Sequence, residues 1–171
     1  MARVLALFAA AAAALPEPGA AQTIEDAARA NAALAVRLCV AAGARAAAAI
    51  PSFTAAGFAY STRGTPGVET WHIFTAPAST VRVELYEGQM APACGIMVNH
   101  LPPSAAGPLI GAVLTRSFPG RFTPSGPGPD SCATYTDSGQ AIGFVVSVGA
   151  ADYSAGCPAL GSTSINIFSA V

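Results

Sequence analysis

The chain has 171 residues, and its eight basic residues, all arginine, nearly balance nine acidic residues to leave a formal net charge of −1 at pH 7. Nucleic acids and anionic membranes are bound by clusters of positive charge, so neither is expected as a partner. Hydrophobic residues make up 53% of the chain, a composition that folds rather than one that stays disordered.

The first residues have the pattern of a secretory signal peptide. Arg3 precedes an uncharged apolar run over Val4–Leu15, and a helix breaker and small residues follow before Gln22. An uncleaved membrane anchor is the less favoured alternative, because about twelve residues span only about 18 Å of a hydrocarbon core about 30 Å thick. The sequence predicts a signal peptide over residues 1–21 and a single periplasmic or secreted domain over residues 22–171, with no membrane span after cleavage.

The cysteines are expected to form two disulfides. An oxidising compartment and an even number of cysteines favour pairing over free thiols. Any of the three pairings is open, and the favoured one joins neighbours in chain order, as Cys39–Cys94 and Cys132–Cys157. A zinc site usually contains closely spaced cysteine pairs, and thiol exchange usually needs a Cys-x-x-Cys motif; neither pattern occurs in the sequence.

Two helical segments are expected before the first strand. Thr23 and the acids that follow it are typical of a helix start, and apolar residues then recur at the helical period to about Ala42. Gly43 either ends this helix or is followed by further helix through Ala49. Because the residue before a proline disfavours the helical conformation, Pro51 is expected to interrupt any further helix and to begin a short separate one over Pro51–Ala56.

Strands are expected next, over 58–63, 68–75, 80–87 and 93–99. The third of these alternates most clearly, with Val81, Val83 and Leu85 on one face and Arg82, Glu84 and Tyr86 on the other. One face therefore belongs to the core, and the other meets solvent or a partner.

The second half of the chain repeats this order of elements. A helix over Ser104–Thr115 is followed by a long loop, Arg116–Asp130, and then by strands over 132–136, 142–148 and 162–169. The whole pattern predicts an α+β fold, a single two-layer domain in which an N-terminal helix and a middle helix pack on an antiparallel sheet of about six to seven strands, with two disulfides.

Candidate catalytic residues are few. His72 lies in the middle of a strand and His100 at the end of another, and neither has a metal-ligand spacing. A structural role is favoured for both, as a cross-strand polar residue for His72 and as a loop cap for His100. No nucleophile motif, phosphate loop or dinucleotide motif occurs in the sequence. No catalytic residue, metal or cofactor is therefore predicted.

The loop Arg116–Asp130 is the predicted binding site. Loops of this length in a small domain are often functional, and Arg and Phe are common anchors of binding surfaces. The candidate binding residues are Arg116, Phe118, Arg121 and Phe122. The alternative, weighted equally, is that the two phenylalanines only pin the loop to the core.

These observations favour an exported, non-enzymatic binding or interaction protein, whose partner is a protein or a small envelope ligand. Two alternatives stay open. One is an exported hydrolase-like enzyme that uses His72 or His100 with Asp130 or Asp137, and the other is a structural protein of the cell envelope.

Overall fold

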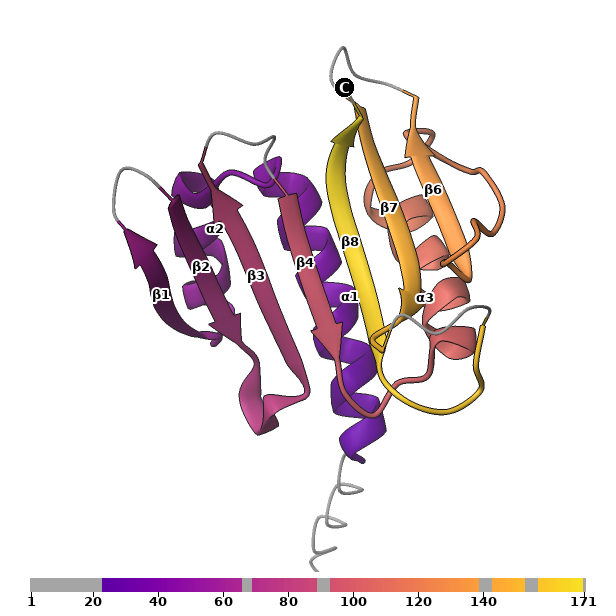
Figure 1. Ribbon diagram of the computed structural model, residues 1–171, viewed down its shortest axis with the longest axis horizontal. Helices are drawn as coiled ribbons and strands as arrows, with labels where there is room; N and C mark the ends of the chain where they lie inside the picture. The colour runs from indigo at the N-terminus through magenta and orange to yellow at the C-terminus, as the bar shows by residue number, and fades with distance from the viewer. Residues whose placement is uncertain (1–22, 66–68, 89–92, 139–142, 153–156, 171) are drawn as a thin grey trace, which may run out of the picture.

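In the computed structural model, which describes residues 23–65, 69–88, 93–138, 143–152 and 157–170, the chain forms an eight-stranded antiparallel sheet. The elements in chain order are α1 (Ile24–Ala42), α2 (Ala46–Ala55), β1 (Ala59–Thr65), β2 (Glu69–Thr75), a 3₁₀ turn (Pro77–Ser79), β3 (Val81–Glu87), β4 (Ala93–Val98), α3 (Pro103–Ser117), β5 (Phe122–Pro124), β6 (Ala133–Asp137), β7 (Gly143–Ala150) and β8 (Thr163–Ala170). The helices cover one face of the sheet (Figure 1). The predicted α+β fold is confirmed, with slightly more strands than expected.

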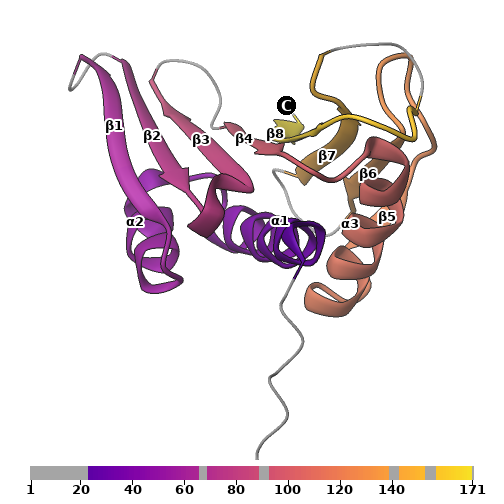
Figure 2. The ribbon, with the colours of Figure 1, turned by 90° about the horizontal axis from the view of Figure 1, so that it is seen from below.

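The sheet consists of two halves that follow the same path. In each half, helix precedes four strands that pair in sequence order, and the last strands of the two halves, β4 and β8, pair with each other at the centre. The strand order is therefore β1-β2-β3-β4-β8-β7-β6-β5. The two halves of the sheet bend away from the helices on either side of the central pair, so that the face turned away from the helices, called here the outer face, is the concave side of the sheet backbone (Figure 2).

Helix α1 begins and ends where the sequence predicts. The Thr23 hydroxyl accepts a hydrogen bond from the backbone N–H of Asp26 at 3.1 Å, and Gly43 ends the helix with a left-handed φ of 63°. Both are standard ways to satisfy the free backbone groups of a helix end. The residues that α1 buries against the sheet are small or medium-sized: Ala28, Ala32, Ala35, Val36, Cys39, Val40 and Ala42.

The prediction that Pro51 interrupts the second helix is wrong. Helix α2 runs through it from Ala46 to Ala55, so Pro51 lies inside the helix rather than at its start. Burial of Ala46, Ala49 and Phe53 against the sheet favours the continuous helix over the local preference of the residue before proline.

The core lies between the helices and the inner face of the sheet. Val81, Val83 and Leu85 of β3 are fully buried, as their alternation predicts. The same inner face continues into β4 and β8 with Ile96, Ile165 and Ile167. The α1 alanines let this helix pack closely on the centre of the sheet.

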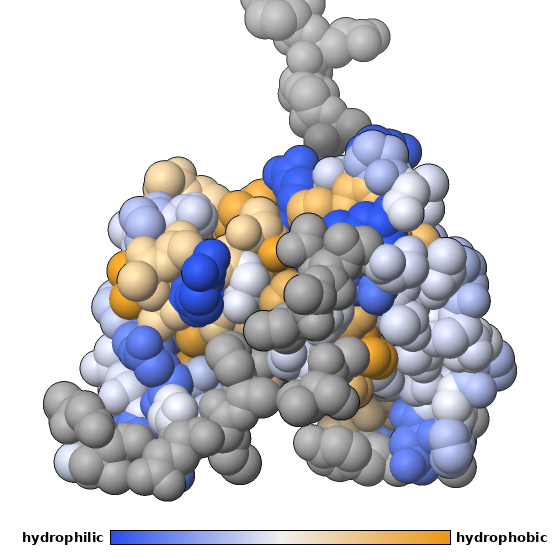
Figure 3. Space-filling model, turned by 90° about the horizontal axis from the view of Figure 1, so that it is seen from above, coloured by the Kyte–Doolittle hydropathy of each residue, from blue (hydrophilic) through white to orange (hydrophobic). Residues whose placement is uncertain are grey.

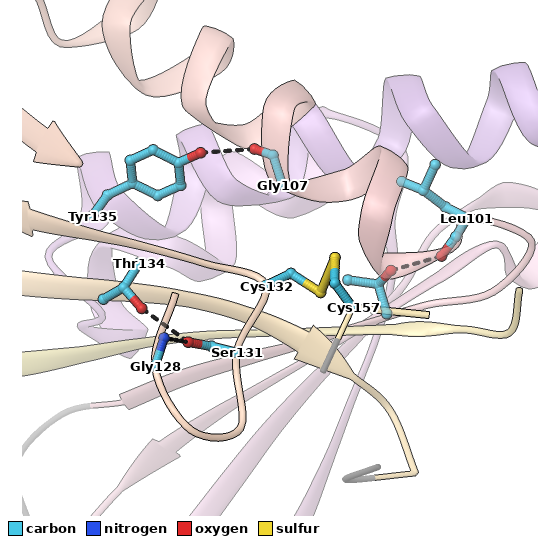
Figure 4. The surroundings of a disulfide bond; sticks show 9 residues. Leu101, Gly107, Gly128, Ser131, Cys132, Thr134, Tyr135 and Cys157 are labelled. Atoms are coloured by element: carbon cyan, nitrogen blue, oxygen red, sulfur yellow. Dashed lines mark hydrogen bonds between the residues drawn. A yellow bond between two sulfur atoms is a disulfide. The ribbon is translucent and has the colours of Figure 1, made fainter. Parts of the chain in front are cut away.

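Both predicted disulfides are present. Cys39–Cys94 joins α1 to β4 within the core, and Cys132–Cys157 joins the residue before β6 to the segment that leads into β8. Polar anchors surround the second bond (Figure 4): Ser131 Oγ accepts from the Gly128 N–H at 2.8 Å, and Tyr135 Oη donates to the Gly107 carbonyl at 2.8 Å. The C-terminal half is therefore closed by its own covalent staple.

The long loop is more structured than predicted. Residues Phe122–Pro124 form the short edge strand β5, which pairs with β6 from Phe122↔Asp137 to Pro124↔Tyr135. A three-residue strand that ends in proline has no alternation to detect, so only tertiary pairing reveals it. This strand accounts for the eighth member of the sheet.

The predicted signal peptide lies outside the described residues. Within the described ranges, none of the helices is both long enough and apolar enough to cross a membrane.

Candidate functional site

The predicted binding loop folds back onto the C-terminal half of the sheet through Arg121. Its guanidinium donates from Nε to Asp137 Oδ2 at 2.8 Å, and Nη2 lies 2.7 Å from the same oxygen. Its Cζ lies 5.6, 5.4 and 5.9 Å from the ring centroids of Phe118, Phe122 and Phe144. The Asp137 side chain is fully buried, so this ion pair anchors the loop inside the domain.

The two phenylalanines of the loop make structural contacts. Phe118 and Phe122 are half-buried, pack against the core and have ring centroids 6.0 Å apart. These are the contacts expected of residues that pin the loop. Three of the four predicted binding residues thus form one cluster around Arg121. The fourth, Arg116, is exposed and lines a hollow between α1 and α3 together with Arg37.

His72 has partners that the sequence did not reveal. Its Nδ1 lies 2.9 Å from Tyr60 Oη of β1, and its Nε2 lies 3.1 Å from Glu87 Oε2 of β3. The strand register brings these residues to one side of the sheet, although they are distant in sequence. The residue is only 7% exposed, so His72 lies at the buried centre of a Tyr60–His72–Glu87 cluster rather than at the sheet surface.

His100 lies in the turn between β4 and α3, where it is exposed and has a left-handed φ of 60°. The preceding residue holds this turn, because Asn99 Nδ2 donates to the Ser79 carbonyl at 3.1 Å. Asp137, one of the predicted acidic partners, is bound to Arg121 instead of to a histidine. The acid that contacts His72 is therefore Glu87, and not Asp130 or Asp137 as the enzyme alternative supposed.

The outer face of the sheet carries an aromatic and charged cluster on its N-terminal half. Trp71 of β2 and Tyr86 of β3 are cross-strand partners with ring centroids 5.0 Å apart, and Arg63 of β1 lies over the Trp71 ring at 5.7 Å. The Tyr86 hydroxyl donates to Glu69 Oε1 at 3.1 Å. Burial, together with the bonded Glu69 carboxylate, raises the pKa of Tyr86 above its ordinary value, so the phenol stays protonated.

Apolar side chains continue across the centre of this face. Phe168 of β8 is 41% exposed and lies opposite Ala93, and Met97 of β4 is 38% exposed and lies opposite Ser164. Between these pairs, Gly95 faces Asn166 without a side chain of its own. The central strands therefore present two exposed apolar side chains with Gly95 between them.

The C-terminal half of the outer face is neutral and polar. The register places Thr134 opposite Ser147 and Thr123 opposite Thr136, and Ser147 in turn lies opposite Asn166. These residues bear no charge, whereas Arg63, Glu69, Arg82 and Glu84 lie on the other half. The outer face thus changes from charged and aromatic to hydroxyl-rich across its central strands.

Sequence reasoning located the outward positions of β3 but missed the surface they belong to. Alternation assigns Tyr86 and Glu84 to one face, yet Trp71 and Phe168 join them only through the cross-strand register. The exposed large apolar residues of one face are therefore visible only after strand pairing is known.

No protein family model matches the chain, and no curated protein and no solved structure matches it either. Within the part of the chain that the structure describes, no group of three or more His, Cys, Asp or Glu side chains is arranged to hold a metal ion.

Proposed function

We propose that this is an exported, disulfide-stabilised interaction protein that binds a partner protein across the outer face of its sheet. Export rests on the signal-peptide pattern and on the two disulfides, which persist in oxidising compartments. The proposal places the contact on the sheet, because the predicted loop residues Phe118, Arg121 and Phe122 already make contacts within the domain.

The observation that carries the proposal is the exposed apolar row at the centre of a face that none of the described helices covers (Figure 1). Met97 and Phe168 are each about two-fifths exposed there. Half-buried Trp71 lies farther out on the same face, with Tyr86 and Ala93 between it and Phe168. Aromatic residues and methionine are enriched in the cores of protein interfaces, where charged residues are depleted.

The charges around this row favour a protein over a polyanion. Arg82 pairs with Glu84, and Arg63 and Glu69 add one charge of each sign, so that the four groups sum to zero. A nucleic acid or an anionic polysaccharide is bound through an excess of cations. A protein that presents apolar side chains framed by charges of both signs fits this surface.

The test is a photo-cross-linking capture from the envelope of the producing cell, with the cross-linker placed at Met97. The expected result is one dominant adduct whose yield falls at least about tenfold when Phe168→Glu is added, because a carboxylate at this position is desolvated on binding. The melting temperature should not change, since position 168 is exposed.

The matched control is Ile24→Glu on α1, where a similarly exposed apolar residue lies on the opposite layer. This variant should keep full capture. Equal capture by the Phe168 and Ile24 variants would reject the outer face as the contact surface. Absence of any specific adduct at Met97 would favour the structural envelope protein.

The Tyr60–His72–Glu87 cluster supports a second candidate, an exported enzyme. Its order of acid, imidazole and hydroxyl is the one that activates a nucleophilic oxygen in triad enzymes, and Tyr60 is 40% exposed. Hydrolysis of a panel of activated esters, lost in Tyr60→Phe and kept in Phe168→Glu, would establish this candidate. Equal rates for the wild type and Tyr60→Phe would exclude it.

A further inference from the structure

The two edges of the sheet differ in how they are protected. The β5 edge is three residues long and contains Pro124, which has no backbone N–H to offer. The β1 edge runs over seven residues without proline, and its register with β2 is uninterrupted from Ala59↔Thr75 to Thr65↔Glu69. Natural sheets usually shorten, bulge or cover their edges, because a free edge pairs with another strand.

Strand β1 is neither short nor covered by another element, and its one charged residue, Arg63, has its guanidinium drawn over Trp71 of β2. Every residue of the strand is exposed, and within the described chain its backbone makes no hydrogen bond outside the pairing with β2. About half of its N–H and C=O groups point away from the sheet, ready to accept another strand.

Helix α2, which packs against β1, also has an exposed face without charge. It contains no charged residue, although a helix at a protein surface normally carries a polar face. Its exposed residues are Ala47, Ala48, Pro51, Thr54 and Ala55. Apolar residues are more frequent on this half of the view in Figure 3 than on the C-terminal half, which is mostly hydrophilic, although charged residues lie among them.

We propose that the edge formed by β1 and α2 pairs with the same edge of a second copy of this chain. The two β1 strands run antiparallel about a two-fold axis at Thr62, which makes one continuous sheet, and the alanine faces of the two α2 helices meet below it. An antiparallel pair of identical strands is self-complementary, as a two-fold interface requires.

The side chains of β1 suit this register. Tyr60 lies opposite Gly64 of the partner subunit, so no side chain of the partner competes with the Tyr60 ring, which stays stacked on His72 and Phe74 of β2. Arg63 lies opposite Ser61 of the partner subunit rather than opposite its own copy. Its guanidinium is drawn over Trp71, on the side away from the free edge, which limits repulsion between the two arginines.

The assembly ends at two copies. Pairing consumes both β1 edges and leaves only the two short β5 edges, which proline protects. A seven-residue strand is about 23 Å long, and a contact over the sheet and helix layers buries about 1,000 Å² in total. Interfaces of this size are weak, so the dimer should dissociate in the micromolar range.

The test is sedimentation equilibrium of the purified protein over about 1 to 500 μM, with charge variants of β1. The wild type should shift from monomer to dimer. Thr62→Lys places two like charges opposite each other on the axis and should weaken the dimer at least about tenfold. Thr123→Lys, the matched change on the β5 edge, should leave the dimer unchanged.

The register has its own test. Ser61→Glu places a carboxylate opposite Arg63 of the partner subunit and should tighten the dimer about threefold, whereas Ser61→Lys should weaken it by a similar factor. Ser61, Thr62 and Thr123 are all exposed, so each variant should have a melting temperature near that of the wild type, which verifies its fold. A wild type that stays monomeric at the highest concentration, or a dimer equally stable in Thr62→Lys and Thr123→Lys, would overturn the proposal. Equal dimer affinity for the two Ser61 variants would overturn it as well.

Discussion

The N-terminal half of the molecule, from α1 to β4, and the C-terminal half, from α3 to β8, follow the same path but differ at their edges. The N-terminal half ends in a seven-residue exposed strand above an uncharged helix, and the C-terminal half ends in a three-residue strand with proline. The C-terminal half also holds a disulfide and a buried ion pair close to its edge.

This difference shows that one topology can be finished in two ways at its edges. Covalent and ionic anchors close the C-terminal half, so its long loop is part of the scaffold. The N-terminal half carries the exposed strand, the apolar helix and the charged and aromatic part of the outer face. We therefore expect stability to be most sensitive to the shared core, to the two disulfides and to the Arg121–Asp137 pair, and association to be most sensitive to the N-terminal half.

The largest effect is expected at the shared core. Val81→Asp places an unpaired carboxylate in a fully buried position, which should cost at least about 4 kcal/mol and leave the protein largely unfolded. Arg82→Ser, one residue along the strand, removes only an exposed pair with Glu84 and should cost less than about 1 kcal/mol. Melting temperatures of the two variants check the prediction, and similar values would mean that the faces of β3 are reversed.

The contribution of each disulfide to the free energy of unfolding should increase with the length of chain that it closes. Cys39–Cys94 spans 55 residues and Cys132–Cys157 spans 25, so replacing each pair by alanine should cost about 4 and about 3.5 kcal/mol in the chain-entropy model. Urea unfolding of the two double variants measures both values. Thiol labelling of the denatured, unreduced wild type should give no adduct; labelled thiols would contradict the pairing itself.

Loss of the Arg121–Asp137 ion pair should lower the free energy of unfolding nearly as much as loss of a disulfide. Arg121→Ala leaves the buried Asp137 carboxylate without its cation and should lower the free energy of unfolding by about 3 kcal/mol. Adding Asp137→Asn removes the stranded charge and should restore part of the loss. An Arg121→Ala/Phe122→Ala variant that melts like the wild type but loses its partner would instead support the loop as the binding site.

The smallest effect is expected at Tyr135, whose hydroxyl donates to the Gly107 carbonyl of α3. Tyr135→Phe should cost about 1 kcal/mol at neutral pH. Burial raises the pKa of Tyr135 above its ordinary value near 10, so the unfolded chain ionises first as the pH rises. The wild type should therefore lose stability above about pH 10, and Tyr135→Phe should lose less, which urea midpoints from pH 8 to 11 will show. Identical pH profiles would mean that this phenol is not protected.

Local patterns in the sequence were sufficient for most of the elements. The cap at Thr23, the stop at Gly43 and the alternation of Val81, Val83 and Leu85 each reflect interactions within a few residues, so they can be recognised without the fold. The disulfide pairing followed from chain order alone. Helix α2 and strand β5 could not be predicted in this way, since packing carries the helix through Pro51 and pairing with β6 creates a strand too short to alternate.

The candidate sites depended on distance in space rather than in sequence. The residues that bind His72 come from β1 and β3, and the acid that holds Arg121 comes from β6. Composition and cysteine number were determined by the sequence itself, because they need no knowledge of neighbours. The strand register decided which exposed residues share the outer face and which edge stays free, because cross-strand pairing is set by long-range contacts that no local pattern encodes.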